Sequence, residues 1–381
     1  MILHELISYD ILRLIWWALL GVILIGFALT DGFDLGVGTM MPFVARNDME
    51  RRIVINTVGP VWEGNQVWLI LAGGAIFAAW PPLYAVSFSG FYLAMFAILF
   101  ALILRPVGFK YRSKLEDTRW RSAWDWALFI GGFVPALIFG VAIGNVLQGV
   151  PFRFDPDLRV YYEGTFFGLL NPYAILCGLV SVTMLVTHGA TWLALKTDGN
   201  IAQRARNYGA VAALLTIVLF ALAGWLLEPM GYRITSTVEP LGPSNPLLKT
   251  AMAEHGAWLS SYDIRPWIWI GPALGFIGAL GAAILLKTRG EVSALLCSSL
   301  SIFGIISTVG LSMFPFILPS SIDPHSSLTV WDTSSSHMTL FIMLVVTVIF
   351  LPIILAYTSY VYHVLWGKVD QKMIDPGDHS Y

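Results

Sequence analysis

Residues 62–68 read Trp62-Glu63-Gly64-Asn65-Gln66-Val67-Trp68 and lie inside a long apolar run from residue 57 to residue 79. Such a run is long enough to cross a bilayer, which takes about 20 helical residues at a rise of about 1.5 Å each. A carboxylate within a spanning helix costs roughly 2.5–3.5 kcal/mol on insertion scales, and neighbouring amides add to this cost unless they find partners. The sequence therefore predicts that Glu63 faces protein or water, as a proton-handling group or one close to a cofactor.

The polar residues of this run would share one face of a continuous helix, because successive helical residues are turned by about 100°. The residues on that face would be Asn56, Gly59, Glu63 and Gln66, with Trp62 at its margin. Glu63 would then lie about ten residues, or roughly 15 Å, from the inner end of the span. A structural hydrogen bond to an adjacent helix is the alternative interpretation of this carboxylate.

The composition indicates a polytopic membrane protein. Of 381 residues, 57% are hydrophobic and 12% are charged, whereas soluble domains average about 25% charged residues. The two cysteines, Cys177 and Cys297, lie in apolar segments, so we expect neither a disulfide framework nor a zinc site. No basic run suggests nucleic-acid binding. We expect residues 1–381 to form a single membrane domain without a cleavable signal.

Nine apolar runs of spanning length follow one another along the chain. They cover approximately residues 9–35, 57–79, 83–104, 124–147, 173–195, 208–227, 267–286, 292–316 and 338–365. Sixteen of the 22 lysines and arginines fall in one alternating set of loops, which includes the C-terminal tail with Lys368 and Lys372. The positive-inside rule then predicts that the N-terminus is outside and the C-terminus inside. The longer loops, 148–172, 228–266 and 315–337, would lie outside and pack as caps.

Two carboxylates, Asp31 and Asp34, stand one helical turn apart near the end of the first span. About 22 residues, or roughly 33 Å, separate Asp31 from the outer start of this span, so both acids should lie near the inner surface. They either bind helix ends and loop arginines at the interface or take part in proton entry. With Glu63 near the midplane, Asp34 could begin a proton route from the cytoplasm that also uses the amides of Asn65 and Gln66.

Other polar residues in the spans have weaker signals. Arg105 closes the third span and Asp125 opens the fourth, so a pair between them could staple the two helices at the inner interface. Anchoring is the favoured interpretation of this pair, and charge tuning of a cofactor or proton path is the alternative. The histidines His188, His337 and His363 could ligate haem, but a hydrogen bond within the bundle is the more common role of a membrane histidine.

Several motifs together resemble subunit II of the cytochrome bd-type quinol oxidases. They include residues 30–36 (Thr-Asp-Gly-Phe-Asp-Leu-Gly), the 62–68 motif, 105–109 (Arg-Pro-Val-Gly-Phe), 144–152 and 328–332. The resemblance covers essentially the whole chain. It implies a multi-pass protein of the bacterial inner membrane, and we expect an all-α fold with about nine transmembrane helices, arranged as two four-helix bundles plus one extra helix.

The resemblance also implies a complex that oxidises quinol and reduces oxygen to water. Subunit I of this family carries the two b-type haems, the d-type haem and the quinol-oxidation loop, whereas subunit II generally ligates no haem iron. A small single-helix accessory subunit, membrane lipid and a structural quinone in this subunit are further expected partners. The acid of the 62–68 motif, here Glu63, is assigned in the family to a cytoplasmic proton path, and the matching makes Asp34, Arg105 and Asp125 candidates for its support.

Two other function classes remain open at this point. A proton-coupled secondary transporter could use Glu63 as its coupling carboxylate, and this class predicts discontinuous helices and repeated halves. A purely structural membrane scaffold is the other. The sequence contains no nucleotide loop, HExxH, CxxC or nucleophile elbow in a fitting context, so it does not resemble a self-contained catalyst.

Overall fold

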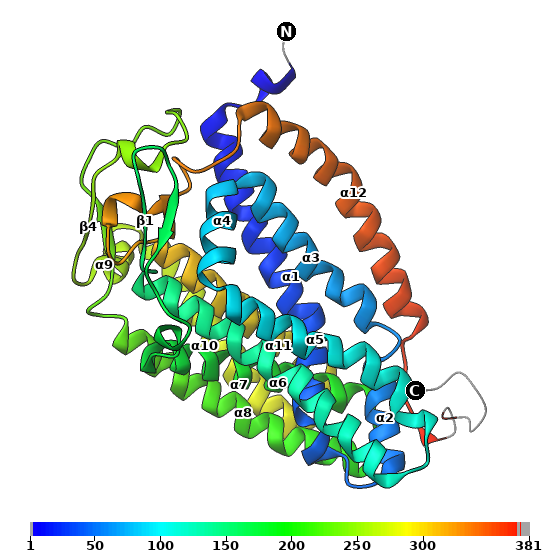
Figure 1. The fold of residues 1–381 in the computed structure, drawn as a ribbon. Coiled ribbons are helices and arrows are strands. Elements are labelled where there is room, and N and C mark those ends of the chain that lie inside the picture. The colour runs from blue at the N-terminus through cyan, green and yellow to red at the C-terminus, as the bar shows by residue number, and fades with distance from the viewer. Residues whose placement is uncertain (1–2, 372–373, 375–381) are drawn as a thin grey trace.

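The computed structural model describes residues 3–371 and 374, and its regular structure is almost entirely helical (Figure 1). The α-helices are α1 (Tyr9–Val44), α2 (Asp48–Val58), α3 (Trp62–Ala79), α4 (Pro81–Gly90), α5 (Tyr92–Tyr111), α6 (Thr118–Gln148), α7 (Pro172–Lys196), α8 (Gly199–Leu226), α9 (Ala257–Ile264), α10 (Ile270–Thr288), α11 (Glu291–Met313) and α12 (His337–Val364). Within the described residues, eight helices are long and apolar enough to cross a membrane, namely α1, α5, α6, α7, α8, α10, α11 and α12.

The apolar run 57–79, predicted as one span, is two helices in the structure. α2 ends at Val58, residues 59–61 form a turn, and α3 begins at Trp62. Pro60 lies in this turn, and its ring removes a backbone donor that a continuous helix would need. The predicted polar face is therefore wrong, because Asn56 lies on α2 whereas Glu63 lies in the first turn of α3.

The predicted third span, 83–104, is also interrupted. α4 ends at Gly90 and α5 begins at Tyr92, then continues to Tyr111. A Cβ atom at Gly90 would lie 2.4 Å from the ring of Tyr162. The missing side chain thus lets a loop hairpin close over the junction between the two helices.

Helix α1 is the centre of the packing and contacts α3, α6 and α7 along its length. It has 36 residues and ends at Val44, nine residues beyond the predicted end of the first span. At the α1–α7 contact, a Cβ on Gly36 would lie 2.0 Å from the carbonyl oxygen of Leu185, so only glycine permits this approach. Helices α7, α8, α10 and α11 pack against one another on one side of α1, and α5 packs on α6.

The three long loops form a cap at one end of the helices. They hold all six strands of the described chain, paired antiparallel as β1 (Phe152–Phe154) with β2 (Val160–Tyr162), β3 (Tyr232–Ile234) with β4 (Ala251–Ala253), and β5 (Phe316–Leu318) with β6 (Leu328–Thr329). Lys249 is half-buried in this cap, where its Nζ lies 2.9 Å from a carboxylate oxygen of Asp332. Burial lowers the pKa of Lys249, and Asp332 acts in the opposite direction.

Helix α12 lies along the bundle with few contacts to it (Figure 1). Among its described residues only Leu340 is buried. Near the cap, Trp16 Nε1 donates a hydrogen bond to the carbonyl of Leu340 (2.9 Å), and just past its other end Lys196 Nζ donates to the carbonyl of Leu365 (2.7 Å). One long face of α12 is consequently exposed on this chain.

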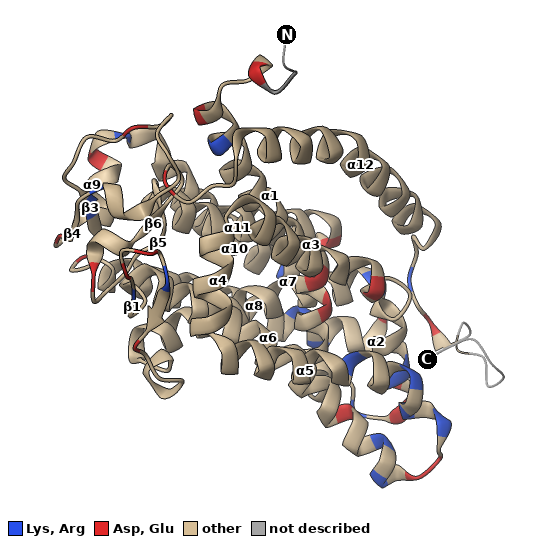
Figure 2. Ribbon diagram, turned by 45° about the horizontal axis from the view of Figure 1, so that its top comes forward, with Lys and Arg blue, Asp and Glu red and all other residues tan. Residues whose placement is uncertain are grey.

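Charged residues gather at the end opposite the cap, around α2 and the α5–α6 connection (Figure 2). We call this the basic end; its arginines include Arg46, Arg51, Arg112, Arg121 and Arg204. It corresponds to the loops that the charge bias assigns to the inside. Lys372, which contributes to that bias, lies outside the described residues.

Candidate functional site

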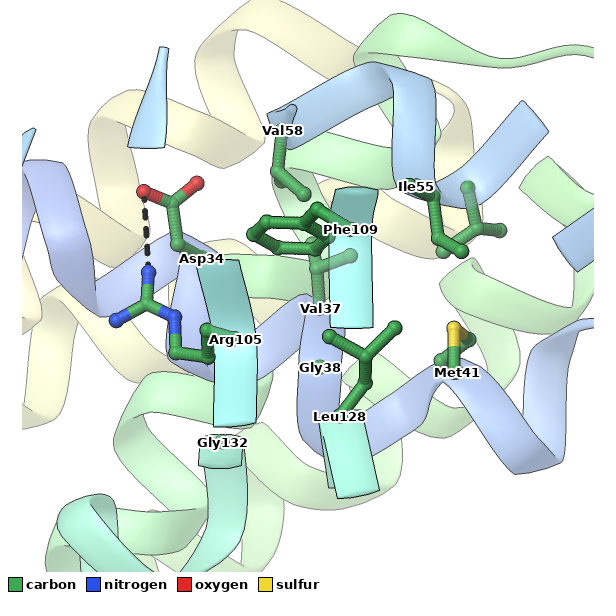
Figure 3. A pocket seen from close by; sticks show the side chains of 11 residues that line it. Asp34, Val37, Gly38, Met41, Ile55, Val58, Arg105, Phe109, Leu128 and Gly132 are labelled. Atoms are coloured by element: carbon green, nitrogen blue, oxygen red, sulfur yellow. Dashed lines mark ion pairs between the residues drawn. The ribbon is translucent and has the colours of Figure 1, made fainter. Parts of the chain in front are cut away.

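Three charged side chains from two helices meet inside the protein. Arg105 on α5 donates two parallel hydrogen bonds to Asp31 on α1, with N–O distances of 2.6 and 2.9 Å. The same guanidinium lies 3.7 Å from Oδ2 of Asp34 (Figure 3). All three side chains are at most 2% exposed. We call these residues the buried acid–arginine cluster.

Two polar residues extend this cluster. Asn65 on α3 donates from Nδ2 to Oδ2 of Asp34 over 2.9 Å. Tyr362 on α12 donates its hydroxyl proton to Oδ1 of Asn65 over 2.6 Å. The other oxygen of Asp34, Oδ1, is buried and accepts no hydrogen bond from the residues that the structure describes. Four helices thus converge on one carboxylate.

The cluster lies deeper than the sequence predicts. Asp31 and Asp34 were expected near the inner surface, but α1 continues for ten residues beyond Asp34, or roughly 15 Å. An apolar layer covers the cluster on the side of the basic end, and Met41 and Val44 of α1 pack in it with Ile55 of α2. The predicted binding to helix ends or loop arginines is therefore wrong, because the acids contact an arginine within helix α5.

A narrow cavity connects Asp34 with this apolar layer (Figure 3). Its lining includes Asp34 and Arg105, with Val37, Val58 and Phe109 among the apolar residues. The space open to the centre of a water molecule is about 10 Å³, which is roughly what one water needs. Asp34 is the one carboxylate of the cluster that faces this cavity.

The other residues of the 62–68 motif lie differently. Glu63 is exposed on this chain, two residues before Asn65. Gln66 is half-buried, but within the described chain it forms no hydrogen bond with Asp34 or Asn65. Trp62 is half-buried and packs against Phe109, with ring centroids 5.8 Å apart. The structure therefore brings Asn65 to the acids and places Glu63 at the surface near the start of α3.

Asp125 belongs to a second cluster at the basic end. The predicted pair between Arg105 and Asp125 is wrong, because Asp125 accepts instead from Arg112 (2.5 Å) and Arg51 (2.6 Å). Arg112 also donates to Asp48 over 2.9 Å. This network ties α2, the end of α5 and the start of α6 together, and an anchoring role for Asp125 stays a prediction.

His188 is hydrogen-bonded on both ring nitrogens. Its Nδ1 lies 2.8 Å from the hydroxyl of Ser298, and its Nε2 lies 2.9 Å from the carbonyl oxygen of Leu29. Both hydrogen bonds are made within the helix bundle, which is the more common role of a membrane histidine. Within the described residues, no three histidine, cysteine or acidic side chains are grouped as metal ligands.

Sequence reasoning missed Tyr362 and Arg112. Tyr362 stands in a stretch of tyrosines at the end of the last apolar run, where only His363 drew attention. A polar residue near the end of a span is usually an interface anchor, so the pattern gave no reason to bring it to Asn65. The signal that existed was the excess of hydroxyl groups from Tyr357 to Tyr362.

Comparison with known proteins identifies the family. The family model described as cytochrome bd terminal oxidase subunit II matches residues 12–365. The chain belongs to this family. It is 52% identical over 377 residues to the Escherichia coli cytochrome bd-I ubiquinol oxidase subunit 2, covering 98% of this chain and 100% of that protein. It is 51% identical over 376 residues to a probable cytochrome oxidase subunit 2 of Haemophilus influenzae, with the same coverage.

A solved structure supports the fold. The bd oxidase from Geobacillus thermodenitrificans contains a chain that superposes with a TM-score of 0.69 and 16% identity, covering 93% of this chain and 98% of that one. At this identity the likeness concerns the fold alone. As a member of the subunit II family with eight candidate spans among the residues described, the chain is a multi-pass protein of the bacterial inner membrane. The transporter and scaffold interpretations are not favoured.

Proposed function

We propose that this chain is the subunit of a quinol oxidase complex that supports assembly and delivers protons, while a partner subunit carries out the redox chemistry. The observation that carries the proposal is the subunit II match over residues 12–365, together with 52% identity to a ubiquinol oxidase subunit 2. The complex oxidises quinol and reduces oxygen to water. The haems b and d lie in subunit I, and protons drawn from the cytoplasm build a membrane potential without a pump.

In this proposal the chain crosses the membrane nine times. Two of the nine spans are interrupted helices: α2 and α3 together form one, and α4 and α5 together form the other. One four-helix bundle is α1, α3, α5 and α6, the other is α7, α8, α10 and α11, and α12 is the extra helix. The mutual packing of α7, α8, α10 and α11 supports the second bundle, and the contacts of α1 with α3 and α6 and of α5 with α6 support the first. The concentration of arginine at the basic end supports a cytoplasmic location for that end.

Subunit I covers the exposed faces of α3 and α12. Both helices are apolar on the side turned away from α1, and Ile70 of α3 and Ile353 of α12 are 73% and 57% exposed. Glu63 lies on α3 among these exposed residues. A carboxylate facing lipid costs several kcal/mol, so contact with a partner protein is the better environment for Glu63.

Asp34 is the proton-carrying group of the buried cluster. One guanidinium faces two buried carboxylates, and its charge balances only one of them. The bidentate geometry assigns that charge to Asp31. An ionised Asp34 would then have no counter-charge of its own, whereas a protonated Asp34 carries no charge and needs none. Its free Oδ1 and the one-water cavity beside it support proton transfer at this atom.

Visible spectroscopy tests the assignment of the haems. The purified complex should show b- and d-type bands, and this chain expressed alone should show none. Haem bands in the isolated chain would overturn the division of labour between the subunits. A quinone bound in this chain is a further prediction. Solvent extraction of the purified chain, followed by analysis for quinone, checks it.

A matched pair of substitutions tests the partner face. Ile353→Trp on α12 should reduce recovery of the partner subunit, because the larger ring blocks close contact. Val218→Trp on α8, at a site 61% exposed, should leave recovery unchanged, because lipid accommodates the ring. Equal recovery of the partner subunit with both variants would show that the partner does not contact this face of α12.

A further inference from the structure

The hydroxyl of Tyr362 reaches the buried cluster from a helix that otherwise barely touches the bundle. The ring is held on two sides, with its centroid 6.0 Å from Trp192 and 6.4 Å from Phe33, both edge-on. The hydroxyl donates to Asn65 over 2.6 Å. Of the described side chains on α12, Tyr362 is the one that hydrogen-bonds to the site.

This hydrogen bond determines which way the Asn65 amide points. An amide has a carbonyl face that accepts and an NH₂ face that donates. Because the phenol proton is given to Oδ1, the Nδ2 group is directed at Asp34, where it donates over 2.9 Å. A hydrogen bond donated to a carboxylate favours its ionised form.

The reverse orientation of the amide would have the opposite effect. The carbonyl of Asn65 would then face Asp34, and only a protonated Asp34 could form a hydrogen bond with it. The other titratable or charged groups around Asp34 are Asp31 from its own helix, Arg105 from α5 and Tyr362 itself. The lining from α2 and α6 is apolar. The orientation of Asn65 is therefore a local control on the proton affinity of Asp34.

We propose that Tyr362 is a positioning residue: it locks the Asn65 amide in the orientation that donates to Asp34, so that the seating of α12 sets the protonation of this carboxylate. The proposal rests on the role of Asp34 in proton delivery given above. It follows that a partner subunit covering α12 would also tune the proton path, since any shift of α12 moves the phenol away from Asn65.

The test is Tyr362→Phe in the complete complex, which keeps the ring in place and removes the hydroxyl. One lost hydrogen bond corresponds to a shift of roughly 0.5 to 1 pH unit. The alkaline limb of oxygen consumption should move upward by that amount, with haem spectra and the KM for quinol unchanged. Tyr208→Phe is the matched control, because Tyr208 lies at the basic end of α8, is 43% exposed and forms no hydrogen bond within the described chain.

Two further variants make the result decisive. Tyr362 acts only through the amide, so in an Asn65→Ala background Tyr362→Phe should cause no additional shift. An unshifted profile in Tyr362→Phe, or an equal shift in both backgrounds, would overturn the proposal. Asp34→Asn is measured alongside, and normal turnover in that variant would refute the proton role instead. The infrared band of the protonated carboxyl, assigned by its loss in Asp34→Asn, should titrate at higher pH in Tyr362→Phe whatever the turnover shows.

Discussion

Replacing each acid of the buried cluster by its amide should separate stability from activity. Asp31→Asn removes the charge that Arg105 contacts with two hydrogen bonds of 2.6 and 2.9 Å. Hydrogen bonds to charged groups are worth about 1.5–3 kcal/mol, and Asp34, at 3.7 Å, replaces the lost charge only in part. We expect Asp31→Asn to lower the free energy of unfolding by about 2–3 kcal/mol.

Asp34→Asn should cost far less. The Asp31–Arg105 ion pair stays intact, and the oxygen of the new amide still accepts the hydrogen bond from Asn65. The NH₂ group replaces an oxygen that has no partner within the described residues, beside a cavity with room for about one water. The expected loss of stability is under about 1 kcal/mol. Oxygen consumption should nevertheless fall steeply, because the carboxyl that we propose exchanges the proton is gone.

Arg105→Leu should cause the largest loss of stability of the three substitutions. It leaves two buried carboxylates without a counter-charge, and breaking a buried pair in this way costs about 3–5 kcal/mol. Thermal unfolding of the detergent-purified complex, haem content and oxygen consumption would be measured on all three variants. If Asp34→Asn proves as destabilising as Asp31→Asn, the unequal sharing of Arg105 is wrong.

Three further outcomes follow from single sites. Glu63→Gln should slow oxygen consumption while haem content stays largely intact, and normal turnover would remove Glu63 from the proton path. Gly36→Ala should prevent assembly, because its Cβ would lie 2.0 Å from a carbonyl oxygen of α7. Gly21→Ala should assemble normally, because its Cβ would meet no neighbouring atom within 4 Å. Recovery of the complex from membranes is the measurement that distinguishes the two variants. The hydrogen bond with Asp198 raises the pKa of Lys368, so the tether beyond α12 is fully formed below the ordinary lysine pKa and is lost as pH rises through the raised one. The protection of amides at this end of α12, measured relative to the intrinsic exchange rate at each pH, should therefore fall only at alkaline pH, and a loss of protection near neutral pH would contradict the tether.

The membrane-protein class and the family could be predicted from the sequence, since both depend on composition and on motifs that are local in the chain. Helix interruptions were harder to predict. The run 57–79 is apolar enough for one span, and Pro60 alone did not indicate that the chain would turn there. The polar face built on that single helix consequently failed.

The charge pairs could not be predicted, because pairing depends on how helices are rotated against one another. Arg105 and Asp125 belong to two consecutive predicted spans. In the structure, however, Arg105 turns inward to α1, and Asp125 pairs with Arg112 at the basic end. Asp31 and Asp34 both lie in the buried acid–arginine cluster, but their partners come from two other helices, α5 and α3. Tyr362 shows the same limit, since nothing in the last apolar run indicates a contact with Asn65.

Proton uptake during a single turnover tests the role of Asp34 most directly. The reduced complex is mixed with oxygen in the presence of a pH-sensitive dye, and uptake is timed against the optical changes of the haems. In Asp34→Asn, electron transfer should begin at the normal rate and proton uptake should lag behind it. Asp125→Asn, at the structural network of the basic end, should show no lag. Uptake in Asp34→Asn that keeps pace with the unmodified complex would contradict the account.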